Sequence, residues 1–401
     1  MNEKMKALGT RRSAIRELFE YGKKRKAEIG DANVYDFSIG NPSVPAPEIV
    51  RETLLKLLRE TDPVALHGYT SAQGDAKVRA AIADYLNQTY GAGVDPDLIY
   101  LTVGAAASLT ISLTALLNPG DEVVLLAPYF PEYRVFVERT GAVVVEVPAD
   151  PETFQPDMDA LQKAITGRTR VLLVNSPNNP TGAVLSEQTV KKIAALLVEK
   201  QEQYDTSIWL IADEPYRELV WGNVKVPYLT NYYDRTIVCY SFSKSLSLPG
   251  ERIGYLLVSP KAKEAKDAYA AVCGAGRALG FVCAPSLFQY LIPACLGKTS
   301  DLSVYAGNRE LLVHALTEYG FRVISPDGAF YLFVEAPEPD ANAFCERAKG
   351  LELLLVPSDS FGCPGYVRIS YCVSTDMIRR SLPAFAKLAA SYGLGRNQKG
   401  K

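Results

Sequence analysis

The chain carries its most informative stretch at residues 240–255, which read YSFSKSLSLPGERIGY. One apolar run ends at Tyr240 and another begins at Gly254, so two predicted strands flank the stretch. Lys244 follows the first run among small hydroxyl residues, and Arg252 lies eight residues later. A lysine beside a buried strand can lose its proton and become a Schiff-base nucleophile, and an arginine with nearby hydroxyls can hold a phosphate. Taken alone, the stretch fits a serine-rich surface loop equally well.

Apolar runs of the same kind recur between residues 99 and 258 and alternate with stretches of helical pattern. They are rich in valine, isoleucine and leucine and read continuously, which is typical of strands covered on both faces. The runs are residues 99–103, 123–127, 143–147, 171–175, 208–212, 236–240 and 254–258. Seven such strands predict one large, mainly parallel α/β sheet. Because ligands gather at the carboxyl ends of parallel strands, the polar residues that follow these runs are candidate site residues.

The last third of the chain has a different pattern, in which a few strands mix with helices. We expect strands at 321–324, 330–334, 353–356 and 367–371, and helices at 12–26, 305–319 and 377–392. This pattern predicts a smaller α+β domain. The predicted parts are an N-terminal segment that packs with the small domain (1–40), a large domain (41–290) and a small C-terminal domain (291–401).

Composition excludes several classes of protein. The 401 residues include 43 Lys and Arg, 45 Asp and Glu, and 48% hydrophobic residues. A chain so apolar can bury a large core, which argues against disorder. A net charge of −2 gives no overall attraction to nucleic acid or to an anionic membrane. We therefore expect neither a nucleic acid nor a membrane as a partner.

Cysteine and histidine usage points to a cytoplasmic protein without a metal. The seven cysteines form no C-x-x-C pair, so neither a zinc motif nor a redox motif is supported. Only two histidines exist, His67 and His314, and we expect packing or surface roles for both. The N-terminus lacks the apolar stretch of a signal peptide. The uncharged run at 98–118 is interpreted as a buried strand that enters a buried helix, rather than as a membrane span.

Two further motifs follow predicted strands. Residues 175–182 read NSPNNPTG, and residues 208–216 read IWLIADEPY, with Asp213 at the end of the strand. In chain order, NNPTG, DEPY and SFSK with its later arginine resemble the class I/II aminotransferases. These are pyridoxal-phosphate (PLP) enzymes of the fold-type-I, aspartate-aminotransferase-like superfamily. The resemblance spans roughly residues 35–375, and it implies a large domain with a mainly parallel sheet plus a smaller α+β domain.

The resemblance implies roles for the residues around the cofactor ring. Lys244 would form the Schiff base with PLP and shuttle a proton between the substrate Cα and the cofactor. Asp213 would face the pyridine nitrogen and keep it protonated. Tyr216 and Asn179 would hydrogen-bond the ring's 3′-oxygen, although Asn179 also suits a turn before proline. Phe130 would cover one ring face, with Tyr129 as a near alternative.

The phosphate of PLP would lie at a turn between a strand and a helix. Residues 102–108 read TVGAAAS, and small side chains there leave backbone N–H groups open at the positive end of a helix. The family uses this turn together with residues that match a serine and an arginine of the lysine stretch. The implied phosphate ligands are Gly104, Ala105, Ala106, Ser241, Ser243 and Arg252. Tyr69, in the segment HGYTSAQG, would reach the phosphate in the neighbouring subunit of a homodimer with shared active sites.

The resemblance implies that Arg368, Gly40 and Asn179 contact the substrate. Arg368 lies inside an apolar strand, where the family's arginine holds the substrate α-carboxylate by two hydrogen bonds. Gly40 matches the family's entrance loop, which we expect to be a mobile lid. Enzymes that use dicarboxylates need a second cation, for which Arg277 is a candidate by rough position only. A place on a helix surface suits Arg277 better.

The implied activity is transfer of an amino group from an L-amino acid to a 2-oxo acid in amino acid metabolism. The same motifs also fit a PLP-dependent C–S lyase or another α-amino-acid enzyme, because they bind cofactor and carboxylate without choosing the bond. A PLP-sensing module without catalysis would need a DNA-binding domain before residue 35, where we see only a short segment. A Rossmann dehydrogenase is disfavoured because no G-x-G-x-x-G follows the first strand. Which amino acid and 2-oxo acid react is left open.

Overall fold

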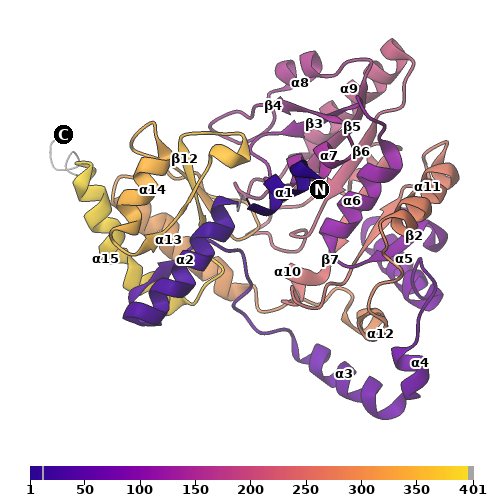
Figure 1. Cartoon of the computed structure of the whole chain (residues 1–401), viewed down its shortest axis with the longest axis horizontal. Coiled ribbons are helices and arrows are strands. Elements are labelled where there is room, and N and C mark those ends of the chain that lie inside the picture. The colour runs from indigo at the N-terminus through magenta and orange to yellow at the C-terminus, as the bar shows by residue number, and fades with distance from the viewer. Residues whose placement is uncertain (11–12, 396–401) are drawn as a thin grey trace.

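Seven strands form one mixed sheet in the computed structural model, which describes residues 1–10 and 13–395 (Figure 1). The strands are β2 (Ile99–Thr102), β3 (Glu122–Leu126), β4 (Val143–Val147), β5 (Thr169–Asn175), β6 (Trp209–Asp213), β7 (Thr236–Ser241) and β8 (Gly254–Val258). Their order is β2-β8-β7-β6-β5-β3-β4, and β8 is antiparallel to both of its neighbours. The prediction of a seven-stranded, mainly parallel sheet is confirmed.

Helices cover both faces of this sheet, and the strand residues alternate between them. Leu210 and Ala212 pack in the core shared with α5 (Ala76–Tyr90), α9 (Glu187–Tyr204) and α12 (Ser286–Cys295). Trp209 and Ile211 pack in the core shared with α6 (Ala105–Leu116), α7 (Glu132–Arg139) and α11 (Ala265–Ala278). We predicted strands buried on both faces, but edge strand β4 is partly exposed, since Val143 is 51% exposed. Among the residues that the structure describes, β3 is its one neighbour, so β4 forms an edge of the sheet.

A second core holds the C-terminal part and the residues that follow α2 (Ala14–Ile29). Its antiparallel sheet has the order β11 (Val356–Pro357), β12 (Tyr366–Ser370) and β9 (Tyr331–Glu335). Strand β1 (Tyr35–Asp36) pairs in parallel with β10 (Leu353–Leu354). Helices α13 (Ser303–Glu318), α14 (Ala341–Lys349) and α15 (Thr375–Ser391) pack on these strands. The domain boundaries after residues 40 and 290 stay predictions.

Two strand predictions in the C-terminal part are wrong in detail. Residues 321–324 form only an isolated bridge, between Val323 and Val334. Pro326 follows closely, and proline has no backbone N–H to continue the hydrogen bonds of a β-ladder. The run 353–356 divides at Leu355, so that β10 pairs with β1 whereas β11 pairs with β12. The run 98–118 does form a strand and a helix, β2 and α6. Within the described residues, no helix is long and apolar enough to cross a membrane.

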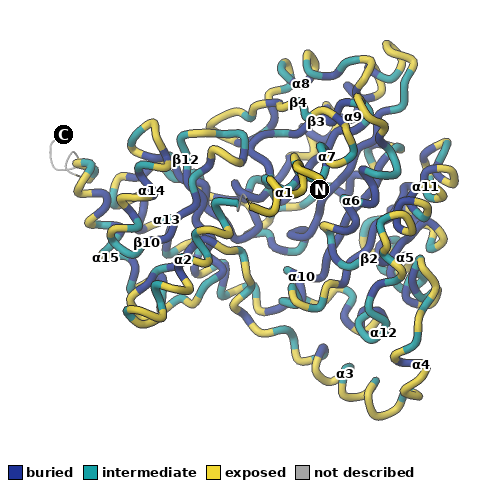
Figure 2. The backbone as a smooth tube through the Cα atoms, in the orientation of Figure 1, coloured by how far each residue is buried: buried dark blue, intermediate teal, exposed yellow. Residues whose placement is uncertain are grey.

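The remaining helices lie mostly on the outside, except the short helix formed by residues 242–245, which is largely buried. They are α1 (Glu3–Thr10), α3 (Glu48–Glu60), α4 (Pro63–His67), α8 (Met158–Ala164) and α10 (Phe242–Ser245), with short 3₁₀ turns at Asp31–Asn33, Pro96–Leu98, Leu229–Asn231 and Asp359–Phe361. Figure 2 shows the strands buried and α1, α3 and α4 largely exposed. The helix predicted from residue 12 begins at Ala14 in the structure; residue 12 itself lies outside the described residues.

Candidate active site

A cavity of about 580 Å³ lies where β5, β6 and β7 end and the C-terminal sheet begins. Its size is typical of sites for small ligands. From the predicted site it is lined by Gly40, Ala105, Ala106, Phe130, Asn179, Asp213, Tyr216, Ser241, Ser243, Lys244, Arg252 and Arg368. These residues come from segments far apart in the chain, so the fold brings together most of the set predicted from sequence.

Lys244 lies on α10, directly after β7. The hydroxyl of Ser241 accepts a hydrogen bond from the backbone N–H of Ser243 and so caps this short helix. Lys244 Nζ donates a hydrogen bond of 2.7 Å to the carbonyl oxygen of Gly40. Burial, together with the charges of Arg368 and Arg252, lowers the pKa of Lys244 to about 8. The amine is therefore neutral in a larger fraction of molecules near pH 7 than a surface lysine would be.

Any residue larger than glycine at position 40 would force the site to rearrange. A Cβ atom at this position would lie 2.0 Å from the hydroxyl oxygen of Tyr331. The glycine thus lets the entrance segment come close to Tyr331 and Lys244.

Asp213 ends β6 with a buried carboxylate. Its Oδ2 accepts a hydrogen bond from the hydroxyl of Tyr133, whereas its Oδ1 is buried without a partner. Burial raises the pKa of Asp213 to about 7, although the hydrogen bond from Tyr133 opposes the rise. A buried oxygen without a partner is costly, and this one belongs to a residue that lines the cavity. A ligand with an N–H group directed at Oδ1 would satisfy it.

Sequence reasoning missed Tyr133 as a partner of Asp213. The residue lies three positions after Phe130, in a segment that follows β3, and both side chains line the cavity. Tyr129, the alternative to Phe130, is buried instead and donates its hydroxyl to Glu146. Of the two candidates Phe130 and Tyr129, only Phe130 is therefore among the residues that line the cavity.

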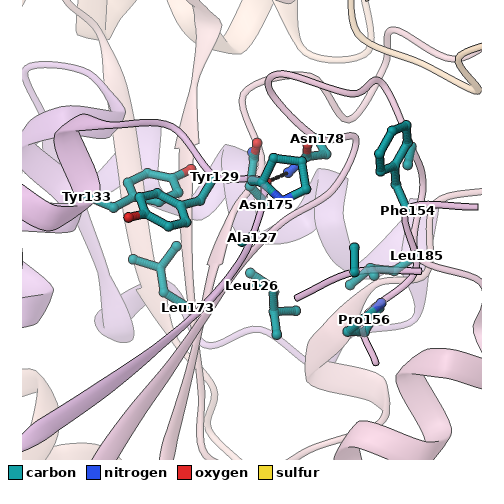
Figure 3. Close-up of a pocket in the computed structure, with 14 residues that line it drawn as sticks. Leu126, Ala127, Tyr129, Tyr133, Phe154, Pro156, Leu173, Asn175, Asn178 and Leu185 are labelled. Carbon is teal, nitrogen blue, oxygen red and sulfur yellow. Dashed lines mark hydrogen bonds between the residues drawn. The ribbon is translucent and has the colours of Figure 1, made fainter. Parts of the chain in front are cut away.

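A second, smaller cavity lies behind these side chains. It has about 30 Å³ of space and shares Tyr133 and Asn175 with the site. Figure 3 shows Tyr129, Tyr133, Leu126 and Leu173 among the side chains that line it. This volume suits a single water molecule.

Arg368 lies on β12 with its guanidinium almost fully buried. Nη1 donates to Asn179 Oδ1 at 3.0 Å, and Nη2 donates to the carbonyl oxygen of Ser38 at 2.6 Å. The guanidinium also lies over the ring of Tyr331, 4.7 Å from its centroid. Nε is buried without a partner, and burial lowers the pKa of Arg368. A buried cation without a protein carboxylate favours an anionic ligand.

Tyr216 and Asn179 are held by other polar groups. The hydroxyls of Tyr216 and Tyr331 are 3.0 Å apart, and the backbone N–H of Asn179 donates to Asn175 Oδ1 at 2.7 Å. Burial raises the pKa of Tyr216 well above its ordinary value. Tyr331 and Ser38 were not predicted as site residues, since nothing in their local sequence marks them.

A group of polar atoms, called the cradle here, borders the cavity beside α6. Gly104 has a φ of +87°, and a Cβ atom there would lie 2.5 Å from Arg252 Nη2. Ala105 and Ala106 begin the helix, where backbone N–H groups lack helical acceptors. The hydroxyls of Ser241 and Ser243 are 2.6 Å apart. The polar groups of this cradle are therefore two hydroxyls, helix N–H groups and one guanidinium. Together they suit an anion.

Three residues named from the sequence do not line the cavity, namely Gly104, Tyr69 and Arg277. Gly104 precedes Ala105, which does line it. Tyr69 is 90% exposed, and Arg277 is exposed on α11. Within the described part of the chain, no group of three or more His, Cys, Asp or Glu side chains is placed to hold a metal ion. The cysteines at positions 239, 273, 283, 295, 345, 363 and 372 are free.

The sequence can now be compared with known proteins. The family model described as aminotransferase class I and II matches residues 32–385. The chain belongs to this family. It is an aminotransferase of fold type I, and the resemblance seen in its motifs is confirmed.

Several relatives support this result along nearly the whole chain. The aspartate/prephenate aminotransferase of Thermus thermophilus is 30% identical over 369 residues, covering 87% of this aminotransferase and 89% of the relative. The aspartate aminotransferase of Thermotoga maritima is 29% identical, covering 92% and 95%. A solved amino transferase from Eubacterium rectale has 58% identity, coverage of 98% and 99%, and a TM-score of 0.96. The Thermus thermophilus aspartate aminotransferase with maleate has 28% identity, coverage of 97% and 99%, and a TM-score of 0.86.

We predict that Tyr133→Phe changes the pH dependence of stability in the cofactor-free protein. The folded-state pKa of Asp213, about 7, lies above its ordinary value of 3.8. Its contribution to the free energy of unfolding is therefore fully present below pH 3.8 and is lost as pH rises through 7. Removing the hydrogen bond from Tyr133 raises this pKa further, so the loss should extend to higher pH. Urea unfolding at intervals from about pH 4 to 9 measures it.

The matched control is Tyr100→Phe, which removes a buried hydroxyl that donates to the carbonyl oxygen of Phe281. It should leave the shape of the pH curve as in the wild type. Asp213→Asn should remove the Asp213 contribution altogether. If Tyr133→Phe and wild type lose stability over the same pH range, Tyr133 does not control this carboxyl group.

Proposed function

We propose that this aminotransferase uses PLP, with Lys244 as the amine that bonds to the cofactor aldehyde. The observation that carries the proposal is the unpartnered Oδ1 of Asp213, which belongs to the same cavity as Lys244 and the cradle at Arg252. A pyridinium N–H, an aldehyde and a phosphate are the three groups that this arrangement would satisfy. Asp213, Lys244 and the cradle residues Gly104, Ala105, Ala106, Ser241, Ser243 and Arg252 would hold them, with Tyr69 supplied by a partner subunit.

The chemistry that PLP supplies when bound is an electron sink for the pair released as the substrate loses its α-proton. The chain's own residues would transfer the proton and hold the cofactor in place. Once the substrate's amine has replaced it on the cofactor aldehyde, the free Lys244 Nζ would accept the α-proton and return it at a carbon of the cofactor. Asp213 Oδ1 would accept a charge-assisted hydrogen bond from a protonated ring nitrogen. Tyr216 and Asn179 would donate hydrogen bonds to the ring oxygen, and Phe130 would cover a ring face.

Substrate would enter beside Gly40 and place its α-carboxylate on Arg368. The buried guanidinium can offer two parallel N–H donors to a carboxylate, and Asn179 is already bonded to Nη1. This contact orients the Cα–H bond toward Lys244, whose amine is held at the carbonyl of Gly40. The substrates would be an L-amino acid and a 2-oxo acid.

A homodimer with shared sites belongs to the same proposal. Tyr69 is exposed, as are Leu55 and Leu58 on α3 and Val64 on α4. Exposed apolar side chains on neighbouring elements are typical of surfaces that other chains cover. A second copy placed there would bury them and direct Tyr69 toward its phosphate cradle. A cytoplasmic location stays a prediction from cysteine usage.

Arg368→Lys is expected to raise KM for every α-amino acid by roughly tenfold or more, because a charge-assisted pair contributes about 1.5–3 kcal/mol. The measurement is initial rates with a panel of L-amino acids and several 2-oxo acids. Lysine keeps the charge and loses the planar pair of donors. Product formation by the wild type should require the 2-oxo acid acceptor; product without any acceptor favours the C–S lyase alternative. An unchanged KM in the variant would remove Arg368 from substrate binding.

A further inference from the structure

Tyr331 lines the active-site cavity, and the proposed function gives it no role. It begins β9, and its side chain is only 3% exposed. We propose that Tyr331 is a positioning residue, whose hydroxyl holds the hydroxyl of Tyr216 toward the cofactor and whose ring holds the guanidinium of Arg368 toward the substrate carboxylate. This inference rests on the proposed function, because Tyr216 and Arg368 receive their roles there.

The register of the C-terminal sheet places Tyr331 beside Arg368. Strand β12 is antiparallel to β9, and Tyr331 lies opposite Ser370. Arg368 is two residues before Ser370 on the same strand, so both project from one face of the sheet. Aromatic and long side chains reach each other across such a diagonal. The guanidinium carbon accordingly lies 4.7 Å from the centroid of the Tyr331 ring.

The ring of Tyr331 stabilises a cation whose other contacts are neutral. In the described part of the chain, the guanidinium of Arg368 donates to the side chain of Asn179 and to the carbonyl oxygen of Ser38. The ring of Phe361 lies 5.3 Å from the same guanidinium. Aromatic faces attract a cation without using its N–H groups. The two rings therefore support the charge and leave the remaining N–H groups for a carboxylate.

The hydroxyl of Tyr331 is enclosed on two sides. It lies 3.0 Å from the hydroxyl of Tyr216, and no room is left beside it for a Cβ atom at Gly40. The rings of the two tyrosines pack edge to face, with centroids 5.8 Å apart. Phe330 packs against both rings. These contacts fix the place of the Tyr331 oxygen, so it can in turn fix the hydroxyl of Tyr216.

A hydroxyl has one proton to donate, which sets the direction of this hydrogen bond when the cofactor is bound. In the protein by itself, either hydroxyl can be the donor of the bond between Tyr216 and Tyr331. Once Tyr216 donates its proton to the ring oxygen of the cofactor, the bond between the tyrosines needs the proton of Tyr331. Hydrogen bonds in such a chain strengthen one another. Tyr331 would therefore both orient Tyr216 and strengthen its donation.

The surroundings keep both tyrosines protonated at and around neutral pH. Burial raises the pKa of Tyr331 to about 12, and the charge of Arg368 opposes the rise. Burial raises the pKa of Tyr216 well above its ordinary value. The charge of Asp213 acts on Tyr216, and the thiol of Cys372, whose own pKa burial raises, acts on Tyr331. A titration of the loaded protein near neutral pH therefore reports on the cofactor and not on either tyrosine.

The test of the hydroxyl uses the visible absorption of the PLP-loaded protein as pH is varied. A hydrogen bond donated to the ring oxygen stabilises its anionic form and lowers the midpoint of this titration. We expect Tyr331→Phe to raise the midpoint by about half to one pH unit, as for the loss of one hydrogen bond. Tyr216→Phe should raise it more. In the Tyr216→Phe background, Tyr331→Phe should add nothing, because Tyr331 acts through Tyr216.

The matched control for the hydroxyl is Tyr371→Phe. Tyr371 is fully buried in the same core, and its hydroxyl donates to the carbonyl oxygen of Ala329. This variant should titrate as the wild type does. The role of the hydroxyl would be overturned by an unchanged midpoint in Tyr331→Phe, by an equal shift in Tyr371→Phe, or by a shift that persists in full without the Tyr216 hydroxyl.

The ring is tested by carboxylate binding to the cofactor-free protein. Propionate is the probe, because it has one carboxylate and no amine, and calorimetric titration gives its affinity. We expect Tyr331→Leu to weaken propionate binding by roughly three- to thirtyfold, as for the loss of a cation–π contact. Tyr331→Phe keeps the ring and should bind propionate as the wild type does. Equal affinity in Tyr331→Leu and the wild type would overturn the role of the ring.

Kinetic constants of the loaded enzyme separate the two ends of the side chain. Tyr331→Phe should lower kcat with KM within about twofold of the wild type, whereas Tyr331→Leu should also raise KM. If the wild type gains no visible band with PLP, the proposed function fails, and propionate binding still decides whether Tyr331 supports Arg368. If the wild type transfers amino groups while Tyr331→Phe titrates as the wild type does, the inference alone fails.

Discussion

Lys244→Ala is expected to lower the rate of amino transfer by about 10⁴-fold or more, because the variant loses both the amine that bonds to PLP and the group that moves the proton. Lys244 Nζ is the lysine amine that lines the cavity, and its pKa of about 8 keeps much of it neutral near pH 8. Alanine has no group that can replace it. Rates under saturating donor and acceptor, with PLP in excess, give the measurement.

The same variant should change two observations that do not depend on turnover. Wild-type protein incubated with PLP and reduced with borohydride should gain the mass of the reduced cofactor on the peptide that contains Lys244, and Lys244→Ala should not. The matched control is Lys191→Ala, because Lys191 is an exposed residue of α9 and should behave as wild type. Turnover of Lys244→Ala at the wild-type rate, or an unchanged mass gain, would contradict the assignment.

Asp213→Asn is expected to lower kcat by roughly 100- to 4,000-fold. Removing one partner of a buried charge pair costs about 3–5 kcal/mol, and every 1.4 kcal/mol is a factor of ten. The carboxylate stabilises the positive charge of a protonated ring nitrogen, whereas the neutral amide does not. Burial of Asp213 makes this contact stronger than it would be in water. Stopped-flow rates of the half-reaction with a single donor measure the effect.

Controls for Asp213 must separate chemistry from folding. Asp213→Glu keeps the charge and should retain more activity than the asparagine variant. Cofactor-free Asp213→Asn should unfold at a urea concentration no lower than wild type near pH 8, because the buried carboxylate with its unpartnered oxygen is costly there. A kcat within threefold of wild type would show that the ring nitrogen does not depend on Asp213.

Local sequence determined the strands and the order of the motifs. Each buried strand is a short run of valine, isoleucine and leucine, and the polar residue at its end lies where the chain leaves the sheet, as at Asp213 and Lys244. That information is contained in consecutive residues, because burial on both faces demands an apolar run. The family could be predicted for the same reason, since its motifs lie within a few residues of strand ends.

Tertiary structure alone decided which distant residues complete the site. Tyr133 reaches Asp213 across 80 positions, Ser38 reaches Arg368 across 330, and Gly40 reaches Lys244 across 204. Nothing in their own neighbourhoods signals these partners, because a tyrosine or a backbone carbonyl has many possible partners until the chain is folded. Patterns of neighbouring residues specify which elements form, whereas contacts between elements depend on how their surfaces fit in three dimensions.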